Sequence, residues 1–222
     1  MSAPPPLPAN QFEAKAFVRF GLGKFRRKRI DETLAPALKL GGNVSSALDL
    51  WDRLEQVPRH DQVSDFHCVT TWSVRGLRWS GYRFADIHTQ LIEPLAQPES
   101  GANVIVLRGS DGYCCALQLD DLLRDDVMLA DRLDGEPLSV DHGAPLRLVA
   151  PAHYGYKSVK HLVAIEYWKD RRHYRFPFPY PGFIDHPRGR VAFEERARLV
   201  PNALLRPIYR FLIPRSVRKQ IR

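Results

Sequence analysis

The sequence predicts a mixed α+β fold, in which short strands form mixed sheets and short helices are inserted between them. Segments rich in β-branched and aromatic residues alternate with turns that contain Gly or Pro along the middle of the chain. Short amphipathic stretches with helical spacing lie between some of these segments. No stretch approaches the roughly 20 apolar residues that a membrane-spanning helix needs, and no internal repeat is present.

The expected elements follow from this pattern in chain order. Ser46 is a candidate N-cap for a helix that ends at Pro58. A second helix is expected to begin near Tyr82 and to stop at Pro94. The expected strands lie at 65–72, 104–107, 113–119, 145–149 and 161–168. Turns or single helical turns are expected at 110–112, 120–124 and 134–137.

Charge and composition divide the chain of 222 residues into three parts. Residues 1–30 form a Pro-rich, basic N-terminal arm with seven Lys or Arg residues against one acid, and it includes the basic run at 26–29. Residues 31–168 are acidic, with 20 acids against 12 basic residues, and residues 169–222 are a basic extension with 14 against four. Because duplex binding needs a basic face on a folded module, the acidic middle argues against a nucleic-acid partner.

Cysteine usage restricts the kind of site that this chain can carry. The three cysteines are Cys68, Cys114 and Cys115, without a C-x-x-C pair. This sparse set argues against a disulfide framework, a structural zinc site and an attached c-type haem. A lone cysteine is most often a small buried hydrophobic residue. The N-terminal residues lack the basic start, apolar stretch and cleavage site of a secretion signal, so we expect a cytoplasmic protein.

Cys68 has neighbours that favour a more specific role. Arg75 and Arg78 follow it closely, and a thiol that lies among cations is expected to have a lowered pKa and to be a thiolate. Thiolates are soft donors that suit soft or high-valent metals. A structural zinc site needs about four protein donors. A single cysteine therefore fits better with a metal whose other ligands come from an organic cofactor.

Several sequence elements, in a fixed order, resemble the molybdopterin domain of the sulfite oxidase family. They are D-F-H-C-V-T-T-W-S at 65–73, D-G-Y at 111–113, G-E-P-L at 135–138, G-A-P-L-R-L-V-A-P at 143–151 and Y-G-Y-K-S-V-K at 154–160. The resemblance covers roughly residues 37–168 and is closest to small bacterial members. It implies that residues 31–168 form a sulfite oxidase-type molybdopterin-binding domain.

The resemblance also implies a molybdenum–molybdopterin cofactor (Mo-pyranopterin) and assigns residues to it. Cys68 would be the one protein ligand to the metal, and Arg147 would meet the pterin phosphate with its guanidinium fork. His67 and His142 would also contact the cofactor, although an ordinary turn histidine is the alternative for His142. The segment that would close over the cofactor tail consists of Lys157, Ser158, Val159 and Lys160. Backbone N–H groups that follow Gly155 could form an anion-binding nest there. The N-terminal cofactor-contacting segment of the relatives has no clear match, and residues 10–12 are the candidate.

The function that the resemblance implies is oxygen-atom transfer to or from a small substrate of the sulfite, S-oxide or N-oxide type. Arg75, Arg78 and Tyr113 are candidates for lining the substrate mouth, with surface or structural roles as the alternative. The sequence has no haem or iron–sulfur motif, so we expect a separate electron-transfer partner. Larger relatives carry a further dimerisation domain, and because 54 residues follow Trp168 we expect this chain to lack it. This difference motivates the alternative of a non-catalytic molybdopterin-binding or interaction module.

The C-terminal residues 196–222 combine apolar side chains with seven arginines. Two interpretations remain open, a helix packed on the domain or a basic tail that docks to a membrane surface or a partner. We expect docking, in which case deletion of residues 203–222 would leave the thermal stability nearly intact.

Overall fold

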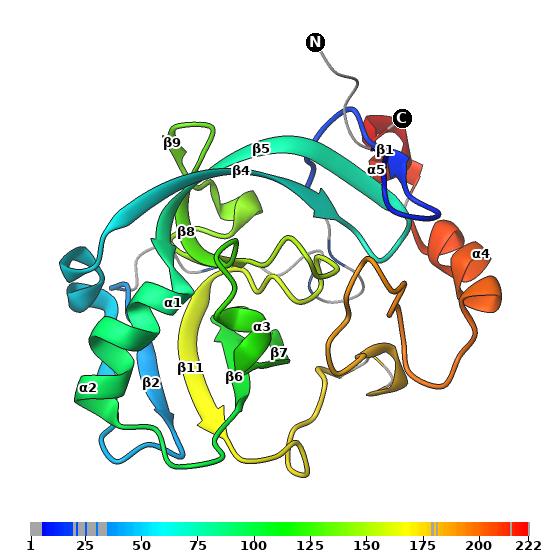
Figure 1. The fold of residues 1–222 in the computed structure, drawn as a ribbon. Helices are drawn as coiled ribbons and strands as arrows, with labels where there is room; N and C mark the ends of the chain where they lie inside the picture. The colour runs from blue at the N-terminus through cyan, green and yellow to red at the C-terminus, as the bar shows by residue number, and fades with distance from the viewer. Residues whose placement is uncertain are drawn as a thin grey trace.

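The computed structural model describes residues 6–19, 21, 25, 30, 35–178, 180, 182–213 and 215–221. The basic run at 26–29 lies outside these residues. Strands dominate and the helices between them are short (Figure 1), which confirms the predicted α+β class. Within the described residues, no helix is both long enough and apolar enough to cross a membrane.

Two sheets build the domain (Figure 1). The six-stranded sheet contains β1 (Phe12–Glu13), β4 (Arg59–His67), β5 (Trp72–Arg83), β8 (Met128–Leu133), β9 (Glu136–Pro137) and β10 (Arg147–Val149). The five-stranded sheet contains β2 (Lys39–Gly42), β3 (Leu48–Asp49), β6 (Val104–Gly109), β7 (Cys114–Gln118) and β11 (Leu162–Trp168). One strand pair in each sheet is parallel, β1 with β5 and β2 with β11, and the other pairs are antiparallel, so both sheets are mixed as expected.

The helices are short connections, apart from two at the C-terminus. They are α1 (Phe84–Ile87), α2 (Glu93–Ala96), α3 (Leu119–Leu122), α4 (Asn202–Leu212), α5 (Arg215–Ile221), a π-helical turn (His88–Ile92) and 3₁₀ helices at Trp51–Gln56, Val140–His142 and Gly182–Ile184. The π-helical turn joins α1 to α2, so the helix predicted near 82–95 is present as a continuous segment over 84–96. Pro94 follows the π-helical turn directly and does not end the helix, which continues to Ala96.

The helix predicted to begin after Ser46 is largely wrong. The chain forms β3 and then a 3₁₀ helix in this region. The carboxylate of Asp49 accepts hydrogen bonds of 3.0 Å from the N–H groups of Leu38 and Trp51. Such local bonds from an Asp side chain compete with regular helix formation.

The chain reverses direction directly after His67, so Cys68 lies in a hairpin turn and not in the middle of a strand. β4 ends at His67 and β5 begins at Trp72. The N–H of Thr71 donates to the carbonyl of Cys68 at 3.1 Å, which closes the turn. Thr71 adopts a left-handed φ of 77°, a conformation that sequence periodicity does not reveal. The strand predicted over 65–72 is therefore wrong in its second half.

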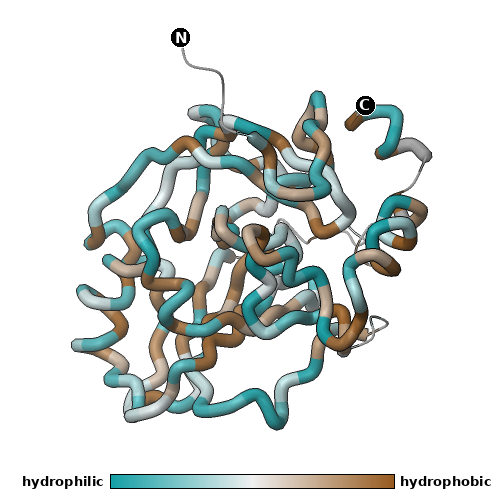
Figure 2. The backbone as a smooth tube through the Cα atoms, turned by 45° about the vertical axis from the view of Figure 1, so that its right-hand side comes forward, coloured by the Kyte–Doolittle hydropathy of each residue, from teal (hydrophilic) through white to brown (hydrophobic). Residues whose placement is uncertain are grey.

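Buried apolar residues form a large core on the five-stranded sheet. Leu40, Ile105 and Ile165 of the sheet pack in one cluster with Phe84 and Ile87 of α1. Figure 2 shows hydrophobic segments concentrated in the interior strands, with hydrophilic segments on the outer loops. This core holds the five-stranded sheet in place, and with it β11 and the loop that precedes β11.

The C-terminal extension packs against the six-stranded sheet. From residue 203 onward, its buried apolar side chains among the described residues are Leu205, Tyr209, Ile213, Val217 and Ile221. The last three share a core with Trp72 of β5, and the carbonyl of Ile221 accepts a 3.2 Å hydrogen bond from the N–H of Lys15 (Figure 1). Deleting residues 203–222 would expose this apolar surface, so the expected neutrality of that deletion is wrong.

Candidate cofactor and metal site

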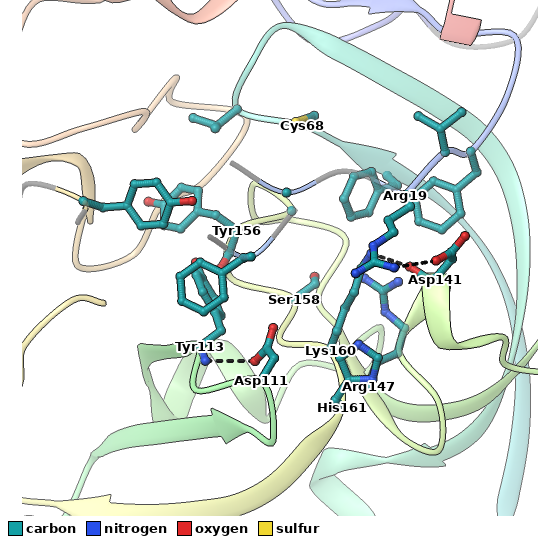
Figure 3. Close-up of a pocket in the computed structure, with 18 of the residues that line it drawn as sticks. Arg19, Cys68, Asp111, Tyr113, Asp141, Arg147, Tyr156, Ser158, Lys160 and His161 are labelled. Carbon is teal, nitrogen blue, oxygen red and sulfur yellow. Dashed lines mark hydrogen bonds and ion pairs between the residues drawn. The ribbon is translucent and has the colours of Figure 1, made fainter. Parts of the chain in front are cut away.

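A cavity of about 1200 Å³, including the part that opens to solvent, receives side chains from the domain and from both ends of the chain (Figure 3). Among the lining residues are Arg19, Cys68, Asp111, Tyr113, Asp141, Arg147, Tyr156, Ser158, Lys160, His161, Tyr180 and Tyr209. The enclosed part of this space is much smaller, at about 170 Å³. The lining side chains, and not the volume, therefore indicate what the cavity can bind.

One side of this cavity carries a buried cation that lacks a counter-ion. Arg147 is 1% exposed and lies over the ring of Trp79, 5.0 Å from its centroid. Its Nη1 donates a 2.8 Å hydrogen bond to the carbonyl of His142. Burial lowers the pKa of Arg147 to about 9, and none of the described carboxylates offsets its charge. A buried guanidinium without a counter-ion is costly, so an anionic ligand is the group that this side of the cavity fits.

Three further side chains lie beside Arg147 in the cavity wall (Figure 3). The Nζ atom of Lys160 donates a 2.6 Å hydrogen bond to the carbonyl of Asp141. Burial, helped by the charge of Arg147, lowers the pKa of Lys160 to about 7. His161 bonds through Nδ1 to the carbonyl of Ala144 at 2.7 Å. Ser158, Lys160 and His161 thus present polar groups next to the unpaired guanidinium.

Two of the three backbone N–H groups of the predicted anion-binding nest at Ser158, Val159 and Lys160 are already bonded within the segment. The N–H of Ser158 donates to the carbonyl of Gly155 at 3.2 Å, and the N–H of Val159 donates to the carbonyl of Lys157 at 3.0 Å. Both donors are therefore used within the segment. The side chains, not these two N–H groups, supply the positive character of the cavity.

Cys68 lies on the opposite side of the cavity from Arg147 (Figure 3). Its Sγ is 3.1 Å from Oγ1 of Thr70. Burial raises the pKa of Cys68 to about 11 and outweighs the opposing effects of Thr70, Arg196 and Lys160. The expectation that nearby cations alone make a thiolate is therefore wrong. A metal would have to displace the thiol proton, as is general for cysteine ligation.

Both ends of the chain hold the turn that carries Cys68. The side chain of Gln11 donates a 3.2 Å hydrogen bond to the carbonyl of Cys68. Arg196 donates a 2.6 Å bond to the carbonyl of Val69. Residues 10–12, considered as a cofactor-contacting segment, thus lie against the turn, and Gln11 itself does not line the cavity.

Four of the predicted cofactor-binding side chains do not line the cavity, namely Lys157, Val159, His67 and His142. Lys157 is fully buried, where its Nζ pairs with Asp185 at 2.7 Å. Val159 belongs to the hydrophobic core. His67 bonds through Nδ1 to Oγ of Ser73 at 2.8 Å. Lys157 and Val159 alternate with Ser158 and Lys160, so they point away from the wall that those two residues form.

His142 supports the site through its backbone. Its carbonyl accepts the hydrogen bond from Arg147, while its ring stacks on Phe17 with centroids 4.7 Å apart. Burial lowers the pKa of His142 to about 4, which keeps the ring neutral near pH 7. The ring does not line the cavity.

Of the three residues expected at the substrate mouth, only Tyr113 lines the cavity. Its hydroxyl donates a 2.7 Å hydrogen bond to the carbonyl of Tyr156. Arg75 instead forms a 3.1 Å ion pair with Glu13 at the surface. Arg78 is exposed, because β5 directs Leu77 and Trp79 inward and Arg78 outward. The placement of Arg75 and Arg78 at the mouth is therefore wrong.

Sequence reasoning missed several lining residues. His161 lines the cavity and directly follows the motif at 154–160. Its place next to Lys160 in the sequence could have indicated this. Arg19 forms a 2.9 Å ion pair with Asp141 beside the cavity, and it was seen only as part of a basic arm. Tyr209 reaches the cavity from α4, and no local pattern in the sequence indicates this.

The donor set fits a metal–pterin cofactor. Within the part of the chain that the structure describes, no cluster of three or more His, Cys, Asp or Glu side chains could hold a metal ion. Cys68 offers one soft sulfur to the cavity, and Arg147 offers an uncompensated cation for a phosphate. The fold and the cavity together therefore fit a domain that binds a metal through an organic cofactor.

Comparison with known proteins gives the same result. The family model described as "Oxidoreductase molybdopterin binding domain" matches residues 30–175, and the chain belongs to this family. It is 34% identical over 143 residues to the uncharacterized oxidoreductase YuiH of Bacillus subtilis, covering 63% of this chain and 66% of that protein. It is 27% identical over 205 residues to the protein-methionine-sulfoxide reductase catalytic subunit MsrP of Xanthomonas axonopodis, covering 81% of this chain and 63% of that protein.

The chain thus spans just under two thirds of the length of these relatives. A solved structure with the same fold is the sulfane dehydrogenase SoxCD of Paracoccus pantotrophus, with a TM-score of 0.53 and 19% identity. That match covers 68% of this chain and 40% of the SoxCD chain.

Proposed function

We propose that this chain is a molybdenum-dependent oxidoreductase that transfers an oxygen atom to or from a small substrate. The observation that carries the proposal is the pairing of two groups in one cavity, the soft thiol of Cys68 and the buried, uncompensated guanidinium of Arg147. When bound, the Mo-pyranopterin cofactor supplies the oxygen transfer and the accompanying two-electron change. The protein binds, orients and shields that group.

The residues divide these tasks by position. Cys68 would bind the metal, and Arg147 would hold the phosphate together with Lys160 and His161. A buried phosphate gains charge-assisted hydrogen bonds from the guanidinium of Arg147 and the ammonium of Lys160, which bind it firmly and fix its orientation. Burial lowers the pKa of His161, so its ring would donate to the phosphate only when the phosphate charge favours its protonated form. The distance across the cavity would then set where the metal lies relative to the Cys68 turn.

Aromatic side chains make the cavity apolar between these two ends. They are Phe17, Phe25, Phe66, Trp72, Tyr113, Tyr156, Phe176, Tyr180 and Tyr209. A wall of this kind excludes water and strengthens the electrostatic interactions within the site. Tyr113 also fixes the backbone of Tyr156 through its hydroxyl, so its role is to position that wall.

The substrate class in this proposal is sulfite, an S-oxide or an N-oxide. A relative whose match spans most of this chain is named a protein-methionine-sulfoxide reductase catalytic subunit, which supports the S-oxide class. That relative is also named a subunit, and by analogy this chain would exchange electrons with a separate carrier.

Helix α4 is the surface at which that carrier would dock. Tyr209 on its inner side lines the cavity. Leu204, Ile208 and Phe211 form one stripe on its outer side and are 61%, 54% and 84% exposed. Because a helix with its side chains is only about 10 Å thick, a protein docked on this stripe would lie close to the cofactor. The excess of basic residues in the extension favours a carrier with an acidic surface.

The decisive test uses protein loaded with molybdenum and pterin. The reduced protein is mixed with methionine sulfoxide, dimethyl sulfoxide or trimethylamine N-oxide, and the oxidised protein with sulfite. We expect the metal to change oxidation state with at least one of these compounds, as followed by its visible absorption. A loaded protein that responds to none of them would instead be a cofactor-binding module without turnover.

A further inference from the structure

The turn that carries Cys68, residues 68–71, is held from outside by arginines of the C-terminal extension. Nη1 of Arg196 donates a 2.6 Å hydrogen bond to the carbonyl of Val69, from 127 positions further along the chain. Nε of Arg210 donates a longer bond of 3.4 Å to Oγ1 of Thr71. The 68–71 turn therefore depends on a distant segment for its position.

Arg196 differs from a surface arginine because its side chain is completely buried. Its guanidinium lies 4.8 Å from the centre of the Tyr154 ring, and its carbonyl accepts a 3.4 Å bond from the hydroxyl of Tyr209. The carboxylate of Glu194 is 3.5 Å from Nη2 and is shared with Arg206. Nε and Nη2 of Arg196 have no hydrogen-bond partner among the described residues.

A buried guanidinium with two unused nitrogens carries an electrostatic cost. Glu194 offsets this cost only in part, since its carboxylate is distant and already paired. Arg196 bonds to the turn that carries Cys68. A metal-bound thiolate at Cys68 would be negatively charged and would supply the compensation that the described protein groups do not.

We propose that Arg196 is a positioning residue for the metal site. Its bond to Val69 fixes the 68–71 turn so that the Cys68 side chain points into the cavity, and it brings a positive charge to the turn that carries the metal-bound sulfur. This inference rests on the proposed function, because it requires Cys68 to bind the metal. Its consequence is that the C-terminal extension takes part in the cofactor site.

Two effects should follow if Arg196 is replaced. Without the bond to Val69, the turn relaxes and the bond between Cys68 and molybdenum lengthens or is lost. Without the nearby positive charge, the more oxidised and more positive metal is favoured, so the reduction potential falls. Neither effect is expected from a residue that only supports packing.

The experiment compares the wild type with Arg196→Gln and Arg196→Lys, each with and without cofactor. Three quantities are measured: the gain in melting temperature on cofactor binding, the number of sulfur ligands at molybdenum by X-ray absorption, and the midpoint potential of the metal. For Arg196→Gln we expect a gain smaller by about 2–4 °C or more, one sulfur ligand fewer and a lower potential. Arg196→Lys keeps the positive charge but lacks the planar guanidinium. We therefore expect its midpoint potential to stay near the wild-type value, while the gain in melting temperature on cofactor binding becomes smaller.

The control is Arg190→Gln, which lies in the same extension but pairs with Glu195 at 2.7 Å and does not touch the turn. It should leave all three quantities unchanged. The proposal is overturned if Arg196→Gln lowers the melting temperature equally with and without cofactor, at unchanged sulfur number and potential. If Arg196→Gln does not fold, Arg196→Lys decides the question. A gain in melting temperature on cofactor binding as large as that of the wild type then overturns the proposal. Wild-type protein that binds no molybdenum would contradict the proposed function itself.

Discussion

Cys68 and Arg147 line opposite sides of one cavity, the thiol on the turn between β4 and β5 and the guanidinium at the start of β10 (Figure 3). The metal and the phosphate would therefore be bound by different elements of the same sheet. This separation means that substitution of either residue should affect a different property of the bound cofactor.

Replacing Cys68 by Ser should leave the fold and the pterin in place but lower the activity by more than about 100-fold. Outer-shell substitutions at metal sites typically cost about 10–100-fold, and loss of a ligand should exceed that range. The matched controls are Cys114→Ser and Cys115→Ser, which are buried outside the cavity and should cost roughly 1 kcal/mol of stability. Turnover assays on metal-loaded variants check this, and wild-type activity in Cys68→Ser would exclude it as the ligand.

Replacing Arg147 by Met should abolish cofactor retention while leaving the cofactor-free protein as stable as before, or more stable. Removing the cation that pairs with a buried anion costs about 3–5 kcal/mol, but without cofactor the guanidinium has no counter-ion to lose. Molybdenum content and melting temperature are measured on each form.

The control for Arg147 is Arg108→Met, because Arg108 pairs with Glu166 at 2.7 Å and does not line the cavity. It should lose a little stability and keep its molybdenum. Full occupancy in Arg147→Met would show that the phosphate binds elsewhere.

Lys160 should give the cofactor-free protein a pH-dependent stability. Its folded pKa is lowered to about 7, whereas an unfolded lysine has a pKa near 10.4. Between these values the unfolded chain binds more protons, so the free energy of unfolding rises as the pH increases from about 7 to about 10. A bound phosphate would restore the charge and flatten this rise. Urea unfolding across this pH range measures the free energy of unfolding at each pH. If that free energy rises with pH as steeply in Lys160→Met as in the wild type, the assignment to Lys160 is contradicted.

The exposed stripe of α4 should matter for electron exchange and not for folding. Replacing Ile208 and Phe211 by Ser should change the free energy of unfolding by about 0.5 kcal/mol or less each, since both side chains are exposed. Activity with a small artificial dye should persist, while reduction by an acidic redox protein such as a flavodoxin should slow. The buried neighbour Leu205, replaced by Ser, should instead lose more than about 2 kcal/mol. Stronger binding of wild type than of the double variant to anionic vesicles would point to a membrane instead of a carrier.

The central strands could be predicted from the sequence because their patterns are local. The segments that became β6, β7, β10 and β11 are rich in β-branched and apolar residues between clear turns. The turn at Cys68 was missed because its residues Val69, Thr70 and Thr71 have strand propensity, and tertiary contacts from Arg196 override it.

The site was predictable only where it follows the family motifs. Arg147 and Lys160 stand in such motifs and line the cavity, and so does Cys68. Lys157 was assigned with them because a motif fixes order along the chain but not the direction of each side chain. Arg196 lies in a loop and Tyr209 in α4, and both segments pack back on the domain. Their contacts with the site have no local signal in the sequence.

The most direct test of the account is the cofactor content of the purified protein. The chain is produced in a host that makes molybdopterin, and molybdenum is measured by elemental analysis while the pterin is measured by fluorescence after oxidation. Binding in one defined cavity predicts about one molybdenum and about one pterin per chain. Protein that is purified in its folded form and contains neither would contradict the account.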